Sequence, residues 1–308
     1  MKAIKRIIKA YRGEAPDFSV PGWSKSRGYD LFTPKDVEEE VPLILVLHGY
    51  THDGRKMRSL TSPDGSPDHP RVFDRMANQR GFAVAYPYGS KIGFLPGRCW
   101  AAGGGVSGFA PVGDPAVRLK VDDVAFIRDL LRHLGAEARI DQDRVFLLGI
   151  SNGGAMVQRL ATEMPECWKG VVTVAGCNQY CAALNTRPGQ AVPRLHIHGT
   201  SDKVWPYEGG KVKAVGVMES VEKSVAGWVQ ANQAQLAEET PLHSAAAEDP
   251  TSVSLRRYQG VAPVEHYIVK NGGHAWPDGD EFMSPRLMGL VCRHFSANQV
   301  ALDFFERC

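Results

Sequence analysis

Short apolar runs recur along the chain and alternate with segments of helical periodicity. Pro42 to His48 reads PLILVLH, and Val145 to Ile150 reads VFLLGI. Continuous runs of this kind are typical of strands buried on both faces of a parallel sheet. Between them, Val121 to Leu134 places apolar residues at helical spacing. This alternation predicts an α/β fold, with a mostly parallel central sheet flanked by helices.

The same patterns predict the other elements. Strands are expected at 27–32, 82–86, 171–175, 194–198, 252–258 and 264–270, and helices at 68–80, 155–163, 212–232 and 296–307. Residues 88–118, rich in Gly and Pro, and the polar residues 233–251 are expected to be loops. Near the start, Ile4, Ile7, Ile8 and Tyr11 have the spacing of a short amphipathic helix that packs on its own domain.

The length suits one large α/β domain, and the sequence contains no internal repeat and no Ser-rich linker. We therefore predict a single domain over 1–308, in which 1–26 form an N-terminal extension. Segments 88–118 and 203–251 are assigned to loops and an excursion on the active-site side of the sheet.

Composition and charge exclude several classes of protein. The chain has 43% hydrophobic and 23% charged residues, as globular proteins do, and a net charge of +2 offers nothing to attract nucleic acid. No apolar run approaches the roughly 20 residues that cross a bilayer, so no membrane span is expected. The N-terminus lacks the apolar core of a signal peptide, which by itself favours a cytoplasmic location.

The cysteines indicate neither a metal site nor a disulfide framework. They form no CxxC pair and no Cys/His cluster with zinc spacing, so no metal is expected. In a chain this long most of them should be buried thiols, with Cys177 and Cys181 close enough in sequence to form a local pair. The six positions are Cys99, Cys167, Cys177, Cys181, Cys292 and Cys308.

Residues 149–153 read Gly-Ile-Ser-Asn-Gly, a G-x-S-x-G motif between a predicted strand and a predicted helix. This context is that of a nucleophile elbow, in which a sharp turn holds the serine hydroxyl above the sheet edge. The flanking residues must be small because backbones pass close to the turn. Alone the motif is weak, since a chain with 32 Gly carries it readily by chance. In this context Ser151 is the candidate nucleophile.

A serine nucleophile needs a histidine base and a carboxylate that orients it, each on a loop after a later strand. Asp202 follows the predicted strand 194–198, and His274 follows the strand 264–270 and two glycines. The alternative for Asp202 is an Asx-turn or helix cap. The remaining histidines of comparable position are expected to have structural roles: His48, His196, His198, His243, His266 and His294.

The developing oxyanion of ester hydrolysis needs hydrogen-bond donors. One is expected from the backbone N–H of Asn152, directly after the nucleophile, and the other from the N–H of Tyr50, in the turn after the strand 42–48. Trp205 and Trp276 follow the acid and the base, so they are expected to contact substrate. The alternative, that these indoles cover the core beneath the loops, is equally compatible with the sequence.

Several segments, in this order, resemble the polyhydroxybutyrate depolymerase and feruloyl esterase family of α/β-hydrolases. They are LVLHGYTHDG (45–54), RCW (98–100), DDVAFIRDLL (122–131), DRVFLLGISNGGAM (143–156), HIHGTSDKVWPYEGG (196–210), WVQAN (228–232) and GGHAWPDG (272–279). The similarity covers roughly 27–307. It implies the α/β-hydrolase fold, no cofactor, and carboxylic ester hydrolysis with Ser151 as nucleophile, Asp202 as acid and His274 as base.

The chain departs from this family at several points. The family usually begins with a signal peptide, so the resemblance favours an extracellular or periplasmic location, against the visible N-terminus. The cysteine that often follows the segment matching 228–232 is absent, and residues 101–118 and 237–251 differ from the family pattern. These differences concern location, disulfides and substrate, and leave the triad unchanged.

The predicted function is hydrolysis of feruloyl, acetyl or hydroxyalkanoate esters, small or polymeric, through an acyl-enzyme. Two alternatives are a serine peptidase on the same fold and a catalytically inactive protein that binds carbohydrate or ester. The peptidase would need an anchor for a peptide terminus, of which the sequence shows no sign. The intact set of triad residues argues against the inactive binder. Oligomeric state and acyl preference are left open.

Overall fold

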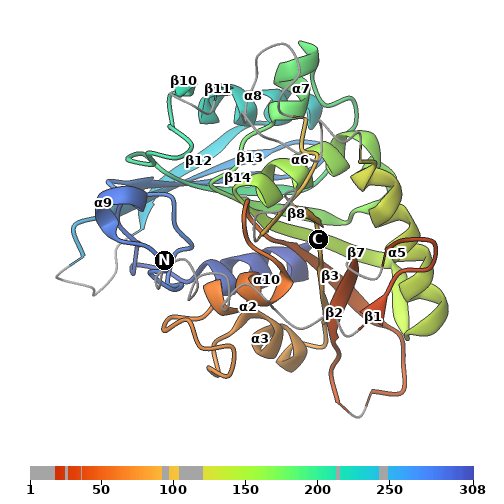
Figure 1. Cartoon of the computed structure of the whole chain (residues 1–308). Coiled ribbons are helices and arrows are strands. Elements are labelled where there is room, and N and C mark those ends of the chain that lie inside the picture. Colours follow the sequence, from red (N-terminus) through yellow and green to blue (C-terminus); the bar gives the residue numbers. More distant parts are fainter. Residues whose placement is uncertain are drawn as a thin grey trace.

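One sheet runs through the described part of the chain, parallel at its centre and antiparallel at both edges (Figure 1). The structure is a computed structural model and describes residues 18–24, 27–35, 37–91, 97–103, 121–212, 216–242 and 249–308. In spatial order the ten strands are β1 (Phe18–Ser19), β2 (Gly28–Phe32), β4 (Ala83–Pro87), β3 (Val41–Leu47), β7 (Ile140–Ile150), β8 (Gly170–Val174), β9 (Arg194–Gly199), β14 (Val264–Lys270), β13 (Ser252–Gln259) and β12 (Gln235–Leu242).

The six strands from β4 to β14 pair in parallel, as the alternation of strands and helices predicts. Their carboxyl ends therefore meet at one edge of the sheet. β1, β2, β13 and β12 extend the sheet in antiparallel pairs. The loops after β3, β7, β9 and β14 all leave from the same edge, where open α/β sheets carry their sites.

Helices cover both faces of the sheet (Figure 1). α5 (Asp123–Glu137), α6 (Asn152–Glu163) and α8 (Val221–Ala231) cover one face, and α2 (Gly54–Leu60), α3 (Phe73–Gln79) and α10 (Ala297–Arg307) cover the other. The alternation of β3 explains this arrangement. Leu43, Leu45 and Leu47 join the core cluster of the first three helices, and Ile44 and Val46 join that of the other three.

Shorter elements complete the described structure. They are the helical turns η1 (Pro165–Cys167), α7 (Gln179–Leu184) and α9 (Pro285–Met288), the ribbon of β5 (Ser90–Lys91) with β6 (Arg98–Cys99), and the ribbon of β10 (Gly210–Val212) with β11 (Gly216–Met218).

Among the segments that differ from the sequence prediction, three have clear local causes. The helix predicted at 212–232 begins only at Val221, because 210–218 contain the β10–β11 ribbon and Ser220 caps α8. The predicted loop 233–251 contains β12, an edge strand of sequence QLAEETPL whose residues are mostly exposed. In the loop after β3, α2 was not predicted; Asp53 begins it by accepting the Lys56 N–H.

All six cysteines lie among the described residues, and none of them forms a disulfide. Cys99, Cys177, Cys181 and Cys292 are buried, as expected. The local pairing of Cys177 with Cys181 is not formed.

In the part of the chain that is described, no helix combines the length and apolarity needed to cross a membrane. The amphipathic helix predicted around Ile4 to Tyr11 lies outside the described residues, as do His243 and the greater part of the loop 88–118.

Candidate active site

Ser151 sits in a strained turn between β7 and α6. Its backbone has φ 56° and ψ −123°, a conformation that a residue with a side chain seldom adopts. Its N–H donates to the Val174 carbonyl of β8, and its own carbonyl accepts the Ala155 N–H in the first turn of α6. The turn is thus held from both sides, and Ser151 remains partly exposed at the sheet edge.

The glycines of the motif are required by close backbone contacts. A Cβ on Gly149 would lie 2.7 Å from the Gly153 backbone, and one on Gly153 would lie 2.5 Å from the His48 carbonyl oxygen and closer still to that of Leu47. Gly49, in the turn after β3, is also close, since its Cβ would stand 3.4 Å from Ser151 Cβ. The loop after β3 therefore packs against the nucleophile turn.

Asp202 lies directly after β9 and is 5% exposed. Its Oδ1 accepts the N–H groups of Val204 (2.8 Å) and Trp205 (2.7 Å), which is the Asx-turn considered above. Its Oδ2 accepts from His274 Nδ1 at 2.7 Å, so the carboxylate closes its own turn and also orients the histidine. Burial alone would raise the pKa of Asp202, but the interactions of this carboxylate with His274 and His198 reverse this and hold that pKa well below its usual value.

The loop that carries His274 is held by close backbone packing. The Gly273 N–H donates to Leu290 O at 2.9 Å, and the Ser201 N–H donates to Gly272 O at 2.9 Å. A Cβ on Gly273 would collide with the Met288 carbonyl and Gly289. The two glycines before His274 therefore let three backbone segments meet.

His274 reaches back across the sheet toward the loop after β3. Burial, followed by the charges of Lys56 and His274, lowers the pKa of His52, in that loop, to about 4. The His52 N–H donates to Gly49 O at 3.2 Å, and Gly49 packs on Ser151. β7, which ends just before Ser151, lies between β3 and β14 in the sheet, so the loops that carry His52, Ser151 and His274 leave from the same edge.

His48 has the structural role that the sequence predicts. Its Nδ1 donates to Gly49 O (2.9 Å), and its Nε2 accepts the Gly89 N–H (2.9 Å). Both ring nitrogens are used by backbone groups, and burial lowers the pKa of His48 to about 3. The ring therefore stays neutral and joins two loops.

The segment 98–103 is clamped to the start of α6. Asn152 Oδ1 accepts the Trp100 N–H at 2.7 Å, its Nδ2 donates to Trp100 O at 3.1 Å, and Trp100 Nε1 donates to His48 O at 3.0 Å. The Ala101 N–H donates to Asp123 at 2.6 Å, and that carboxylate forms a buried ion pair with Arg27 at 2.6 Å. These contacts fix the turn after β3 relative to the N-terminus of α6, the two segments predicted to supply the oxyanion donors Tyr50 and Asn152.

Trp205 and Trp276 are buried in the core, at 5% and 0% exposure. Trp276 Nε1 donates to Asn298 Oδ1 of α10 at 2.9 Å. Trp205 joins the core cluster on the α5–α8 face, and its carbonyl accepts from His198 Nε2. This burial disagrees with the expectation that the two indoles contact substrate. It matches the alternative that they cover the core beneath the loops, so neither is retained as a substrate contact.

Sequence reasoning missed the contact between His198 and the acid. His198 Nε2 lies 3.4 Å from Asp202 Oδ2, the same oxygen that His274 Nδ1 contacts. The available signal was spacing: His198 is the last histidine of its strand and precedes Asp202 by four residues across a tight turn.

A parallel sheet with a strained serine turn after β7, and with a hydrogen-bonded Asp–His pair after β9 and β14, defines an α/β-hydrolase. Residues 122–229 match the family described as phospholipase/carboxylesterase. A putative esterase, NocK, of Nocardia uniformis subsp. tsuyamanensis is 30% identical over 277 residues, which are 85% of this chain and 73% of that protein. The chain belongs to this carboxylesterase family, and it is a carboxylic ester hydrolase.

Two further proteins show how widely this likeness extends. A probable feruloyl esterase C of Aspergillus clavatus is 28% identical over 156 residues, half of each protein. An acetyl xylan esterase from Aspergillus awamori has the same fold, with a TM-score of 0.58, 13% identity, and coverage of 92% of this chain and 94% of that one. The relatives named here include a feruloyl esterase, as the resemblance predicts, but do not single out polyhydroxybutyrate depolymerases.

Proposed function

We propose that the protein hydrolyses carboxylic esters through an acyl-enzyme formed on Ser151. The observation that carries the proposal is the buried Asp202–His274 hydrogen bond of 2.7 Å, which lies at the same edge of the sheet as the strained Ser151 turn. An Asp–His pair of this kind holds an imidazole ready to accept the proton of a serine hydroxyl.

In the acylation step Ser151 Oγ attacks the ester carbonyl while His274 Nε2 takes its proton. Asp202 Oδ2 accepts the Nδ1–H, which fixes the tautomer and stabilises the imidazolium once it forms. The low pKa of Asp202 keeps the carboxylate ionised, so the proton stays on the imidazole. His274 then returns the proton to the leaving alcohol oxygen as the carbon–oxygen bond breaks.

The tetrahedral oxyanion is assigned to the backbone N–H groups of Asn152 and Tyr50. Asn152 begins α6, where N–H groups point out of the helix without an acceptor inside it and the helix dipole favours negative charge. The contacts of the Asn152 side chain with Trp100 hold this end of the helix in place. Water, activated by the same imidazole, then cleaves the acyl-enzyme.

Esters of plant polysaccharides, feruloyl or acetyl, are the proposed substrate class, and hydroxyalkanoate esters are the alternative acyl group. The support is a relative named as a feruloyl esterase and a fold shared with an acetyl xylan esterase. Initial rates on methyl ferulate, acetylated xylan and hydroxybutyrate oligomers rank the three. A peptide anilide included in the panel tests the peptidase alternative.

The test of the mechanism is Ser151→Ala, with Ser252→Ala on the exposed side of β13 as the matched control. The first variant should lose at least about 10⁴-fold in kcat on a short p-nitrophenyl ester, whereas the control should retain the parent rate. Circular dichroism and thermal unfolding of both variants check that the fold is kept. A folded Ser151→Ala protein with the parent rate would refute the assignment.

A further inference from the structure

A buried row of polar side chains leads away from Asp202 on the face of the sheet that α6 and α8 cover. Thr173 of β8 and Arg194, His196 and His198 of β9 are at most 1% exposed. The alternation of β9 places its three polar residues on one face, whereas Leu195 and Ile197 join the core on the other. A row so deeply buried has no contact with bulk water, so its polar atoms depend on neighbouring protein groups for hydrogen bonds.

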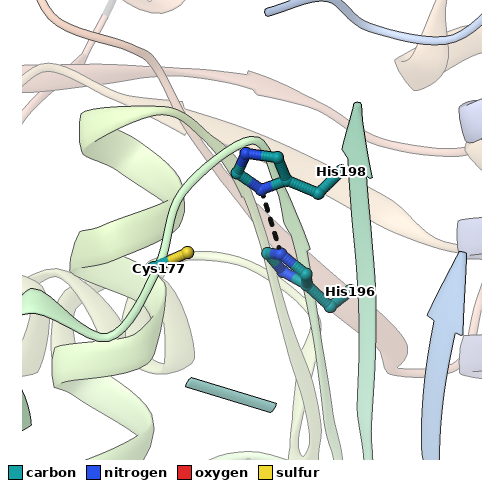
Figure 2. A group of neighbouring side chains, drawn as sticks. All are labelled: Cys177, His196 and His198. Carbon is teal, nitrogen blue, oxygen red and sulfur yellow. Dashed lines mark hydrogen bonds between the residues drawn. The ribbon is translucent and has the colours of Figure 1, made fainter. Parts of the chain in front are cut away.

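The contacts in this row are consecutive. Arg194 Nη2 donates to Thr173 Oγ1 (3.4 Å), and Thr173 Oγ1 is 2.7 Å from His196 Nδ1. His196 Nε2 is 3.2 Å from His198 Nδ1, the bond drawn in Figure 2. His198 Nε2 is 2.9 Å from Trp205 O and 3.4 Å from Asp202 Oδ2. The row thus connects a buried guanidinium to the carboxylate that holds His274.

With both imidazole rings neutral, the two ends of the row fix the direction of every hydrogen bond in it. A carbonyl and a carboxylate only accept, so His198 Nε2 carries a proton. In a neutral ring His198 Nδ1 then accepts, so His196 Nε2 donates to it. Burial, followed by the neighbouring histidines and Arg194, lowers the pKa of His196 well below its usual value, so that ring is neutral and its Nδ1 accepts from Thr173. The Thr173 oxygen is left with lone pairs for Arg194, which only donates.

We propose that Thr173, His196 and His198 form a one-way hydrogen-bond relay that positions Asp202 for the triad. This inference rests on the proposed function of Asp202 and His274. Every dipole in the relay points its positive end toward Asp202 and its negative end toward Arg194. Chains of hydrogen bonds polarise one another in a low-dielectric interior, so Arg194 strengthens the donor that reaches Asp202. His198 is a positioning residue, because it acts on the reaction only through that carboxylate.

The surroundings of Arg194 support this assignment. Its guanidinium stacks over the Trp228 ring at 4.7 Å, and its Nε and Nη1 have no hydrogen-bond partner among the described residues. An arginine keeps its charge even when buried. A buried arginine would usually be bonded to a carboxylate. Here the negative ends of the relay's dipoles face this cation instead.

Cys177 lies beside the two histidines, as Figure 2 shows, and the three offer ligand atoms within 4.8 Å of one another. A shared metal ion is therefore the competing assignment. Every ring nitrogen of His196 and His198 already has a hydrogen-bond partner, so a metal would have to displace at least one of these bonds. The nearby charge of Arg194 also opposes a second cation, and the relay accounts for all four nitrogens.

The titratable and charged groups around the relay come from several elements. His266 of β14 and Tyr207, after β9, pack against the histidine rings, and Cys177 and Arg194 complete the surroundings together with Asp202 and His274. Several of these groups could also affect the pH profile. A change in that profile is therefore attributed to the relay only when it separates two variants of one residue that differ in a single hydrogen-bond donor.

The direct test reads the tautomers by ¹⁵N NMR of histidine-labelled protein carrying Ser151→Ala, so that it is independent of activity. His196→Gln and His198→Gln assign the signals. The expected result is the neutral Nε2–H tautomer for both rings at about neutral pH. One equivalent of Zn²⁺ should leave both signals unchanged. An Nδ1–H tautomer or a doubly protonated ring at either position overturns the relay, as does a stoichiometric shift of both signals with zinc.

The kinetic test compares His198→Phe, which removes the donor to Asp202, with His198→Gln, which keeps an N–H near the Nε2 position. We expect kcat to fall about tenfold in the first variant with KM within about twofold, and most of the loss to be recovered in the second. The acid limb of the kcat/KM profile should move up by about half a pH unit in His198→Phe, because Asp202 without its second donor binds the imidazolium more tightly.

Thr173→Val and Thr173→Ser form a milder pair with little effect on volume, should His198→Phe fail to fold. Only the valine variant, which lacks the hydroxyl, should change the His196 signal and lower kcat. If Ser151→Ala retains activity, the proposed function fails. The histidine tautomers measured by NMR still test the relay in that case. If Ser151→Ala is inactive while His198→Phe and Thr173→Val match the parent in kcat and pH profile, the relay has no role and the inference is wrong.

Discussion

At the scale of single residues, Asp202 shows that a structural and a functional interpretation of one side chain can both hold. Its Oδ1 closes an Asx-turn with Val204 and Trp205, and its Oδ2 faces His274 and His198. The turn fixes the carboxylate plane, so the second oxygen has a set direction. This arrangement explains how a short loop after β9 can hold an acid in place.

The first prediction concerns this carboxylate. Asp202→Asn should lower kcat by about 10⁴-fold, because the amide favours the wrong tautomer of His274. Steady-state hydrolysis of a p-nitrophenyl ester measures the change. Asp249→Asn is the control: Asp249 likewise accepts backbone N–H groups and lies 3.8 Å from a histidine, His294, but it is in a different loop. Equal losses in both variants would speak against a specific role for Asp202.

The second prediction concerns Asn152, whose side chain clamps the segment 98–103. Asn152→Ala leaves the backbone donor in place but frees the helix start from Trp100, so kcat should fall by about 10-fold or more with a smaller change in KM. Asn185→Ala, at the exposed C-cap of α7, is the control and should match the parent. An unchanged kcat in Asn152→Ala would show that the clamp does not position the oxyanion donors.

The sequence predicts a residue of the candidate site when the role of that residue follows from its own position along the chain, and misses it when the role depends on a distant partner. Ser151, Asp202 and His274 each follow a strand directly, and sheet topology alone brings such positions to one edge. Trp276 was misjudged because its hydrogen-bond partner, Asn298, lies 22 residues further on in α10. The relay was missed because its members Thr173 and His196 meet across two strands whose register no local pattern reveals.

At the scale of elements, the nucleophile turn depends on how closely β3, β7 and α6 approach one another. The third prediction is that Gly153→Ala destabilises the fold by about 3 kcal/mol or more and lowers activity, because the added methyl meets the Leu47 and His48 carbonyls. Gly189→Ala is the control, since its Cβ would have nothing within 4 Å. Urea unfolding of both variants measures the difference. Equal stability of the two would show that the contact at Gly153 can relax.

Most central strands, and the helices α5, α6 and α10, were predicted to within a few residues, because buried parallel strands and amphipathic helices have strong periodicity. β12 gave no such signal, since an exposed edge strand has no buried face. In α2 the start at Gly54 and a length of 7 residues gave too little pattern, although Asp53 is a standard N-cap. The residues of the β10–β11 ribbon were predicted to be part of the helix that follows it.

At the scale of the whole molecule, several buried histidines make stability depend on pH. Burial lowers the pKa of His48 and His266 to about 3 and that of His52 to about 4. The unfolded chain binds protons on these rings near pH 6.5 and the folded chain does not. Below that pH the unfolded state therefore binds more protons, and the free energy of unfolding falls as the pH falls toward 4.

The fourth prediction isolates one of these rings. Neither nitrogen of His266 has a hydrogen-bond partner among the described residues, so His266→Phe removes a titrating group without breaking such a bond. The fall in unfolding free energy between about pH 7 and pH 5 should shrink by up to about 2 kcal/mol relative to the parent. His133→Phe, at a partly exposed position on α5, should keep the parental pH dependence. If His266→Phe also kept the parental pH dependence, the lowered pKa assigned to buried His266 would be wrong.

The most direct measurement of the central claim is covalent capture of the nucleophile. The protein is treated with a fluorophosphonate, digested, and mapped by mass spectrometry, with Ser151→Ala and heat-unfolded protein in parallel. We predict one adduct per chain, on the peptide that contains Ser151, formed at the rate at which esterase activity is lost and absent from both controls. Loss of activity with the adduct on another residue, or full esterase activity in a protein labelled at Ser151, would contradict the account.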